Sequence, residues 1–186
     1  MNKVYVFLAD GFEEIEALAV VDILRRAQLD VAIVGVGGPM PSSPIGAHQI
    51  QVAMDIHEEE LDVTEVDAVI LPGGMPGTLN LEKSNVVQQT LRHAMEHNLP
   101  VGAICAAPSI FGKHGMLTNI KATCFPGFES QLLNAVVTDA SVVTDGVFTT
   151  ARDYEAATEF AKELVKICEI LGIEPKEELD AIEEAK

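Results

Sequence analysis

The sequence predicts an α/β protein with a mainly parallel sheet and helices on both faces. Short runs of β-branched and aromatic residues alternate along the chain with longer segments of helical periodicity. Several runs end in polar or glycine-containing turns, and turns at the carboxyl edge of a parallel sheet build functional sites. At 186 residues, with 48% hydrophobic and 22% charged residues, the chain is long enough for one domain, residues 1–186, with a substantial core.

The chain begins with two predicted strands that flank a helix. Residues 4–8 and 31–36 are short, β-branched apolar runs of the kind that form buried strands. Between them, residues 13–27 have helical spacing, and Asp10 and Glu13 stand at capping-box spacing ahead of the helix.

The middle of the chain continues the alternation. Residues 50–53 predict a short strand, and residues 66–71 predict a buried one that ends in Pro-Gly-Gly. Residues 84–96 have helical spacing, with Ser84 as the N-cap, and residues 100–104 form the next buried strand.

The last third carries weaker strand signals and one long helix. Strands are predicted at residues 121–123, 141–144 and 147–150, and an amphipathic helix is predicted at residues 153–171. Residues 174–186 are acidic and are expected to form a tail or a short terminal helix in solvent.

Charge and cysteine content narrow the classes of function. The formal net charge of −17 argues against nucleic-acid binding and against attraction to anionic lipid. Three widely spaced cysteines argue against a disulfide framework or a zinc site and favour a reducing compartment. No apolar run suits a signal peptide or a membrane span, so we predict a cytoplasmic protein.

The sequence lacks the motifs of common cofactor sites. It contains neither a phosphate-binding P-loop nor a dinucleotide fingerprint. His93 and His97 are one helical turn apart, but Ala94 stands where a zinc metalloprotease carries glutamate, so surface histidines are the better interpretation. We therefore predict no cofactor and no bound metal.

The most informative segment is residues 101–108, where an apolar strand leads into Cys105, two alanines and Pro108. Because proline can open a helix, this order places the thiol at a strand-to-helix turn. We expect the helix dipole to lower the pKa of the thiol and to make it a better nucleophile and a target for oxidation. A buried, inert cysteine is the alternative, which we prefer for Cys168; Cys124 is expected in the core or partly exposed.

A single carboxylate, Glu16, interrupts the apolar stripe of the first predicted helix, formed by Phe12, Val20, Ile23 and Ala27. Burial would raise the pKa of this group and favour its protonated form. A protonated Glu16 near Cys105 could donate a hydrogen bond to a thiolate and later act as a general acid or base. The spacing also fits a partly exposed glutamate near the helix start, where the dipole favours it, and leaves both interpretations open.

Gly73 and Gly74 follow the strand predicted at residues 66–71, at the same sheet edge as Cys105. Glycines let the backbone approach a ligand closely, and their N–H groups can stabilise an oxyanion, as can the N–H of Ala106. A plain tight turn is the alternative explanation of the pair.

Four segments, in order, match a known family. They are residues 9–16 (ADGFEEIE), 20–27 (VVDILRRA), 71–74 (LPGG) and 103–108 (AICAAP). On these segments the chain resembles the ThiJ/PfpI superfamily, in the branch of DJ-one and its YajL-type bacterial relatives. The matches span the first two-thirds of the chain, and the last third matches more loosely, through residues 149–152 and the helix after them.

This resemblance implies a flavodoxin-like three-layer sandwich, usually assembled as a homodimer. It implies that Cys105 is an oxidation-sensitive nucleophile at a nucleophile elbow and that Glu16 is its protonated partner. Gly73 and Gly74 would form a backbone oxyanion site in this family.

The resemblance also marks an arginine pair and two departures. Arg25 and Arg26 match family arginines, one of which helps to form the dimer or binds an anion near the cysteine; without the match they are surface charges. Ala106 stands where the protease branch has histidine after the cysteine, which weakens a peptidase reading. Phe125 stands where the family has a second histidine, which leaves His114 as the candidate histidine partner of the Cys105 thiol.

The resemblance implies a reactive-carbonyl stress protein with glyoxalase-like or deglycase-like chemistry on small carbonyls or glycated adducts. The alternative is a redox sensor or chaperone that acts through oxidation of Cys105 to sulfinic acid. A thiamine-biosynthesis role, attached to the family name, has no support in these residues, and peptide hydrolysis is weakened by Ala106.

Overall fold

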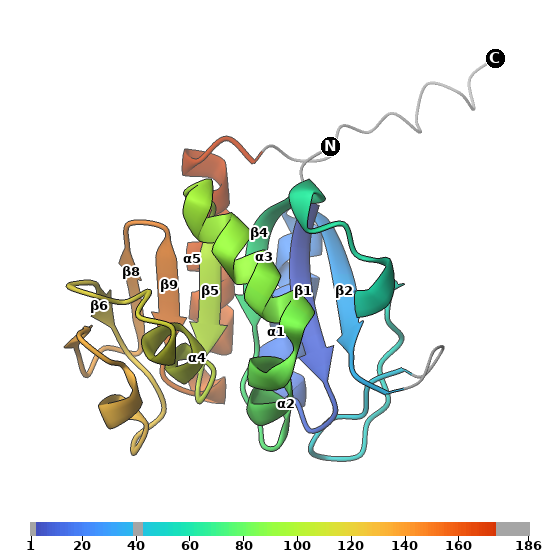
Figure 1. Cartoon of the computed structure of the whole chain (residues 1–186), viewed down its shortest axis with the longest axis horizontal. Coiled ribbons are helices and arrows are strands. Elements are labelled where there is room, and N and C mark those ends of the chain that lie inside the picture. The colour runs from blue at the N-terminus through green and yellow to red at the C-terminus, as the bar shows by residue number, and fades with distance from the viewer. Residues whose placement is uncertain (1–2, 39–42, 174–186) are drawn as a thin grey trace.

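The computed structural model, which describes residues 3–38 and 43–173, contains a seven-stranded sheet in the order β3-β2-β1-β4-β5-β9-β8 (Figure 1). Neighbouring strands are parallel except β8 and β9, which form an antiparallel pair. The strands are β1 (Lys3–Ala9), β2 (Asp30–Val36), β3 (Ile56–His57), β4 (Val66–Leu71), β5 (Val101–Ile104), β8 (Val142–Asp145) and β9 (Phe148–Ala151). Two further strands, β6 (Lys121–Ala122) and β7 (Val136–Val137), form a separate small sheet.

Helices cover both faces of the large sheet, which confirms the predicted three-layer α/β fold (Figure 1). The helices are α1 (Glu14–Arg26), α2 (Gly77–Lys83), α3 (Asn85–Glu96), α4 (Pro108–Lys113) and α5 (Ala157–Ile170). One core contains the buried sides of α1 and α5, and the other contains those of α3 and α4. The order β2-β1-β4-β5-β9 is that of flavodoxin-like sheets, whose ligand sites lie where the strand order reverses, here between β1 and β4.

Strand β1 shows why the apolar runs have no polar alternation. Val4, Val6 and Leu8 face the core under α1 and α5, whereas Tyr5 and Phe7 face the other core. Since side chains alternate across a strand, a strand covered on both faces needs apolar residues at every position.

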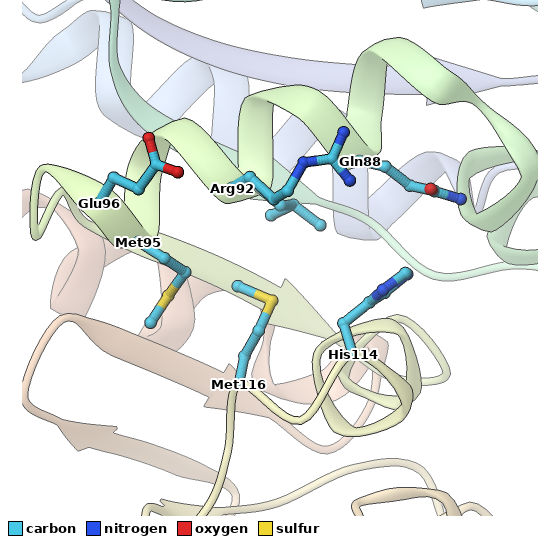
Figure 2. Close-up of a pocket in the computed structure, with 7 residues that line it drawn as sticks. Gln88, Arg92, Met95, Glu96, His114 and Met116 are labelled. Carbon is cyan, nitrogen blue, oxygen red and sulfur yellow. The ribbon is translucent and has the colours of Figure 1, made fainter.

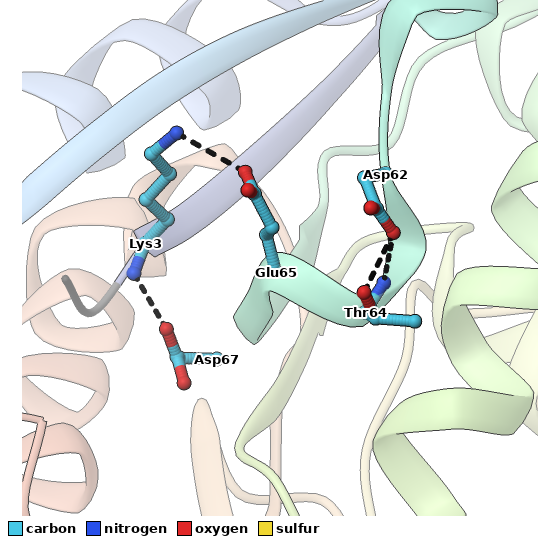
Figure 3. A network of polar contacts seen from close by, with 5 residues as sticks. All are labelled: Lys3, Asp62, Thr64, Glu65 and Asp67. Atoms are coloured by element: carbon cyan, nitrogen blue, oxygen red, sulfur yellow. Dashed lines mark hydrogen bonds and ion pairs between the residues drawn. The ribbon is translucent and has the colours of Figure 1, made fainter.

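Polar contacts fasten the amino ends of β1 and β4, the edge opposite to Cys105 (Figure 3). The backbone N–H of Lys3 donates to Asp67 Oδ2 at 2.7 Å, and its ammonium group pairs with Glu65 Oε2 at 3.5 Å. Asp62 caps the short 3-10 helix Val63–Glu65 through the N–H and hydroxyl of Thr64. These groups are largely exposed, so the ion pair contributes little to stability.

Two predictions for the chain before β4 are wrong. Residues 50–53 are not a strand: Gln51 makes one isolated bridge with Ile45, and the strand that joins the sheet is β3. These residues instead pair with residues 44–46 of the same loop, where the N–H of Val52 donates to the carbonyl of Pro44 at 3.0 Å. The loop lies against the chain before α1, and the N–H of Gly11 donates to the carbonyl of Ile45 at 2.8 Å. Asp10 does not cap α1, because its Oδ1 accepts from the N–H of Ile45.

Helix α2 was not predicted. It has seven residues, begins with Gly77 after Pro76 and has no side-chain N-cap, so neither periodicity nor a start signal marks it in the sequence. Helices α1, α3 and α5 agree with their predicted ranges to within a few residues, and α4 begins at Pro108, where a helix was expected to open. Residues 154–156 form a 3-10 turn ahead of α5.

The prediction of an acidic tail or short helix at residues 174–186 lies outside the described residues. Among the helices that the structure describes, none combines the length and the apolar character needed to cross a bilayer.

Candidate active site

Cys105 lies between β5 and α4, at the predicted strand-to-helix turn. Its backbone has φ +64°, a left-handed conformation that costs a non-glycine residue about 1–3 kcal/mol. Two hydrogen bonds hold it there: its N–H donates to the Ala151 carbonyl at 2.9 Å, and its carbonyl accepts from the N–H of Phe125 at 2.8 Å. The neighbouring strand β9 and the segment after β6 therefore fix the position of the thiol.

Glu16 reaches Cys105 from the first turn of α1. The side chain is only 1% exposed, so the interpretation of a partly exposed glutamate is wrong and that of a buried carboxyl is confirmed. Its Oε2 accepts from the N–H of Gly73 at 2.8 Å, and the carboxyl group is also hydrogen-bonded to the Cys105 thiol. Glu13 is the N-cap of α1 and accepts from the N–H of Glu16 at 2.7 Å, which fixes this turn of the helix.

Burial raises the pKa of Glu16 to about 7. The negative charges of Glu13 and Asp153 act in the same direction as burial, and the hydrogen bonds with Cys105 and Gly73 act against it; the pKa of about 7 is the net result. The carboxyl group thus changes its charge near neutral pH, where a general acid or base is most effective.

The structure does not support the expectation that the thiol of Cys105 is acidified. Burial raises the pKa of Cys105, and the adjacent Glu16 carboxylate raises it further. The N–H groups of Ala106 and Gly74 act in the opposite direction, and α4, with six residues, is too short to contribute a full helix dipole. The pair therefore resists carrying two negative charges, and a thiolate forms readily only when Glu16 holds a proton.

The two glycines after β4 have different roles. The N–H of Gly73 is occupied by Glu16, so the expectation that it belongs to an oxyanion site is wrong. A Cβ at this position would lie 2.6 Å from Glu16 Oε2 and 2.7 Å from Cys105 Cβ, so the site requires glycine there. Gly74, with φ +93°, directs its N–H to the Cys105 sulfur together with that of Ala106, as an oxyanion site needs.

Arg25 and Arg26 lie at the other end of α1. At 1.5 Å per residue, Arg25 is about 14 Å from Glu16 along the helix axis. Its guanidinium pairs with Asp55 at 2.7 Å and donates to the carbonyl of Val31, at the amino end of β2. An anion site near the cysteine is therefore wrong for this pair, and a role in a dimer stays a prediction.

The remaining cysteines and His114 lie outside this site. Cys124 and Cys168 are buried, and burial raises their pKa values to about 11 and about 12. His114 caps the far end of α4 and lines a separate cavity with α3. None of the five histidines, all of them within the described residues, is hydrogen-bonded to Cys105.

Sequence reasoning missed the ion pair beside the site. Arg152 follows β9, whose last residue, Ala151, pairs with Ile104 just before Cys105. The Nε of Arg152 lies 3.1 Å from Asp153 Oδ2, and the charge of Asp153 acts on Glu16. The position of Arg152 and Asp153 directly after a strand, at the carboxyl edge of the sheet, was the sequence signal that could have placed this pair near the site.

Three potential metal ligands lie near the start of α1. Donor atoms of Glu13, Glu14 and His48 lie within 4.8 Å of one another. The Glu14 carboxylate already accepts from the N–H of His48 at 2.7 Å and contacts its Nδ1 at 2.7 Å. Because hydrogen bonds account for this cluster, it carries no metal-site proposal, and the absence of a metal stays a prediction.

The family model described as DJ-1/PfpI family matches residues 2–167. This chain belongs to the DJ-1/PfpI family. Protein DJ-1 homolog B of Arabidopsis thaliana is 33% identical over 88% of this chain, and the match covers only 37% of that protein's own length. Protein dj-1beta of Drosophila melanogaster is 33% identical over 94% of this chain and 92% of its own length. A Pyrococcus abyssi protein named as a deglycase is 29% identical over 89% of this chain and 98% of its own.

Solved structures confirm the fold. A cysteine-to-alanine mutant of a DJ-1 superfamily protein from Salmonella typhimurium aligns with TM-score 0.83 and 29% identity, over 100% of this chain and 96% of its own. Toxoplasma gondii DJ-1 in an oxidised form aligns with TM-score 0.78 and 28% identity, over 92% of this chain and 98% of its own.

We predict that Glu16 makes folding stability depend on pH. Its pKa is about 7 in the folded protein against 4.5 ordinarily, so its stabilising contribution is full below pH 4.5 and is lost as pH rises through 7. Relative to Glu16→Gln, the free energy of unfolding of the wild type should fall by about 3 kcal/mol over that interval.

Urea denaturation at a series of pH values measures this difference. The exposed Glu155→Gln serves as the control and should follow the wild type. Parallel pH profiles for wild type and Glu16→Gln would contradict the perturbed pKa.

Proposed function

We propose that this protein is a cysteine-dependent enzyme that acts on small reactive carbonyl compounds, with glyoxalase-like or deglycase-like chemistry. The observation that carries the proposal is the hydrogen-bonded pair of the Cys105 thiol and the buried Glu16 carboxyl, whose pKa is about 7. The deglycase name of an archaeal relative supports the same class of chemistry.

The raised thiol pKa suits a mechanism in which Glu16 first acts as a base. With Glu16 ionised, the sulfur attacks the aldehyde carbon of a 2-oxoaldehyde while its proton passes to the carboxylate. A carbon–sulfur bond forms, the carbonyl π electrons move to oxygen, and the N–H groups of Gly74 and Ala106 face the resulting oxyanion. Protonation of that oxygen by Glu16 gives a hemithioacetal and restores the carboxylate.

The same carboxylate can then isomerise the adduct. It removes the hydrogen on the former aldehyde carbon as a proton, which leaves an enediolate. It returns that proton to the adjacent carbon, while the hydroxyl proton on the first carbon passes to the oxygen of the second. The product is a 2-hydroxy thioester on Cys105, and water hydrolyses it to the 2-hydroxy acid and the free thiol. The sum is addition of one water to the oxoaldehyde, without an external oxidant or reductant.

Purified protein should convert methylglyoxal to lactate without glutathione. Cys105→Ala should abolish turnover, and Glu16→Gln should lower kcat by about 10²–10⁴, because proton transfer loses its base. The value of kcat/KM should rise with pH through about 7 as Glu16 ionises. Cys124→Ala, the matched cysteine control, should retain activity, and turnover that survives Cys105→Ala would refute the proposal.

A redox role is the second candidate. Cys105 is the one partly exposed cysteine of the three, and its sulfur faces the N–H groups of Ala106 and Gly74, which can hold sulfinate oxygens. The oxidised state of the Toxoplasma gondii DJ-1 structure favours the same possibility.

Under mild hydrogen peroxide, Cys105 should gain two oxygens, one from each of two peroxide molecules, before Cys124 or Cys168 reacts. The reason is access, since the other two thiols are buried. Peptide mass spectrometry measures the three rates. Equal rates would exclude the sensor, and selective oxidation without carbonyl turnover would favour it over the enzyme.

We also propose that the protein forms a homodimer. Ile15, Ile45 and Ile50 are 40–51% exposed on the start of α1 and on the loop that wraps it, and hydrogen bonds join this loop to α1. Sedimentation velocity should give twice the chain mass of 19.9 kDa, and Ile15→Glu should give the monomer. A wild type that sediments as a monomer would contradict this proposal.

A further inference from the structure

A cavity of about 320 Å³, apart from the Cys105 site, opens between α3 and the end of α4 (Figure 2). Its lining residues are Gln88, Leu91, Arg92, Met95, Glu96, His114 and Met116. The volume falls within the range of small-molecule sites. Neither Cys105 nor Glu16 lines this cavity, so it is spatially separate from the proposed carbonyl site.

One end of the cavity is suited to an anion. Figure 2 shows the Arg92 guanidinium beside the Gln88 amide, with the His114 ring across from them. Arg92 forms no ion pair with any residue in the described ranges, although the chain has 29 acidic residues against 12 basic ones. By contrast, Lys113, next to His114, already pairs with Glu82 at 2.8 Å. A guanidinium in this state has its donors free for a carboxylate, which it binds in a bidentate geometry.

The other end is apolar and adaptable. Leu91 is buried, Met116 is half-buried, and Met95 is 38% exposed. Thioether side chains fill irregular gaps and make favourable contacts with aromatic rings. Figure 2 places both methionines on the side away from the Arg92 guanidinium, so a ligand of this shape would span the cavity from a charged head to a ring.

Glu96 lies at the methionine end and fixes the direction of such a ligand (Figure 2). A carboxylate placed there would meet a like charge, whereas one placed beside Arg92 meets an opposite charge. A cationic ligand with its head beside Arg92 is disfavoured for the same reason.

We propose that the cavity between α3 and α4 binds a small aromatic monocarboxylate, with the carboxylate beside Arg92 and His114 and the ring between Met95 and Met116. The assignment combines an unpaired guanidinium with an adjoining thioether-lined pocket of ligand size. It requires no contact with the Cys105 site.

Methionine methyl NMR of the full chain tests this proposal, because the chain has six methionines and each methyl signal can be assigned by Met→Leu substitution. On titration with 3-phenylpropionate, the Met95 and Met116 signals should shift together with a dissociation constant of about 1 mM or tighter. The neutral isostere 3-phenyl-1-propanol should bind at least about five-fold more weakly, because it lacks the charge for Arg92.

Arg92→Gln should weaken binding of 3-phenylpropionate by about ten-fold, and Arg92→Lys should restore part of it. Lys162→Gln, an exposed cation on α5, at the opposite face of the sheet, is the matched control and should leave the constant unchanged. The rate of Cys105 alkylation, measured on each variant, should stay at the wild-type value and shows that the fold is intact.

Three results would overturn the proposal. The first is the absence of shifts at Met95 and Met116 up to about 10 mM ligand, well above the expected dissociation constant. The second is equal affinity for the acid and the alcohol, which would mean an apolar pocket without anion recognition. The third is unchanged affinity in Arg92→Gln when the alkylation rate is unchanged.

Discussion

One buried carboxyl group joins three parts of this protein that are far apart in sequence. Glu16 lies on α1 after β1, accepts from Gly73 after β4 and is hydrogen-bonded to Cys105 after β5. A carboxyl group with 1% exposure loses nearly all of its hydration, so these partners must replace the water it gives up. The arrangement of the three loops and the chemistry of the thiol both depend on this contact.

The fold explains why the contact exists. In a parallel sheet of this order, the strand connections diverge between β1 and β4, and the loops after these strands leave a space at the carboxyl edge. Glu16 enters the space from one side, and the backbone of Gly73 approaches from the other because it has no side chain to obstruct it. Cys105, directly after the neighbouring strand β5, completes the cluster.

The sequence alone was sufficient to predict the three-layer fold and to single out Cys105 and Glu16 as site residues. Runs such as residues 4–8 and 66–71 are continuous and apolar because both sheet faces are covered, so their strands could be predicted. Cys105 could be singled out because it follows an apolar strand and precedes a helix-opening proline, and Glu16 because it interrupts an apolar stripe. Their contact, by contrast, depends on tertiary packing, and spacing along one helix left the burial of Glu16 undecided.

Other features had no local signal. Helix α2 is held by its neighbours rather than by a cap, and the segment at residues 50–53 resembles a strand but pairs its backbone with residues 44–46 of the same loop. The direction of the thiol pKa depends on solvation and on a charge brought by another element, so a dipole argument from neighbouring residues had the wrong sign. Arg25 matched a family position, but only the structure shows it paired with Asp55, at the opposite sheet edge.

The left-handed backbone of Cys105 has a consequence for how this protein can change over evolution. Glycine adopts φ near +64° without strain, so a chain with glycine in place of Cys105 would lose the backbone strain at this position. A substitution of Cys105 by glycine that stabilises the backbone therefore removes the thiol on which the proposed chemistry depends. The sulfur atom therefore occupies a position that has a cost in stability, and the hydrogen bonds to Ala151 and Phe125 hold the backbone in this conformation.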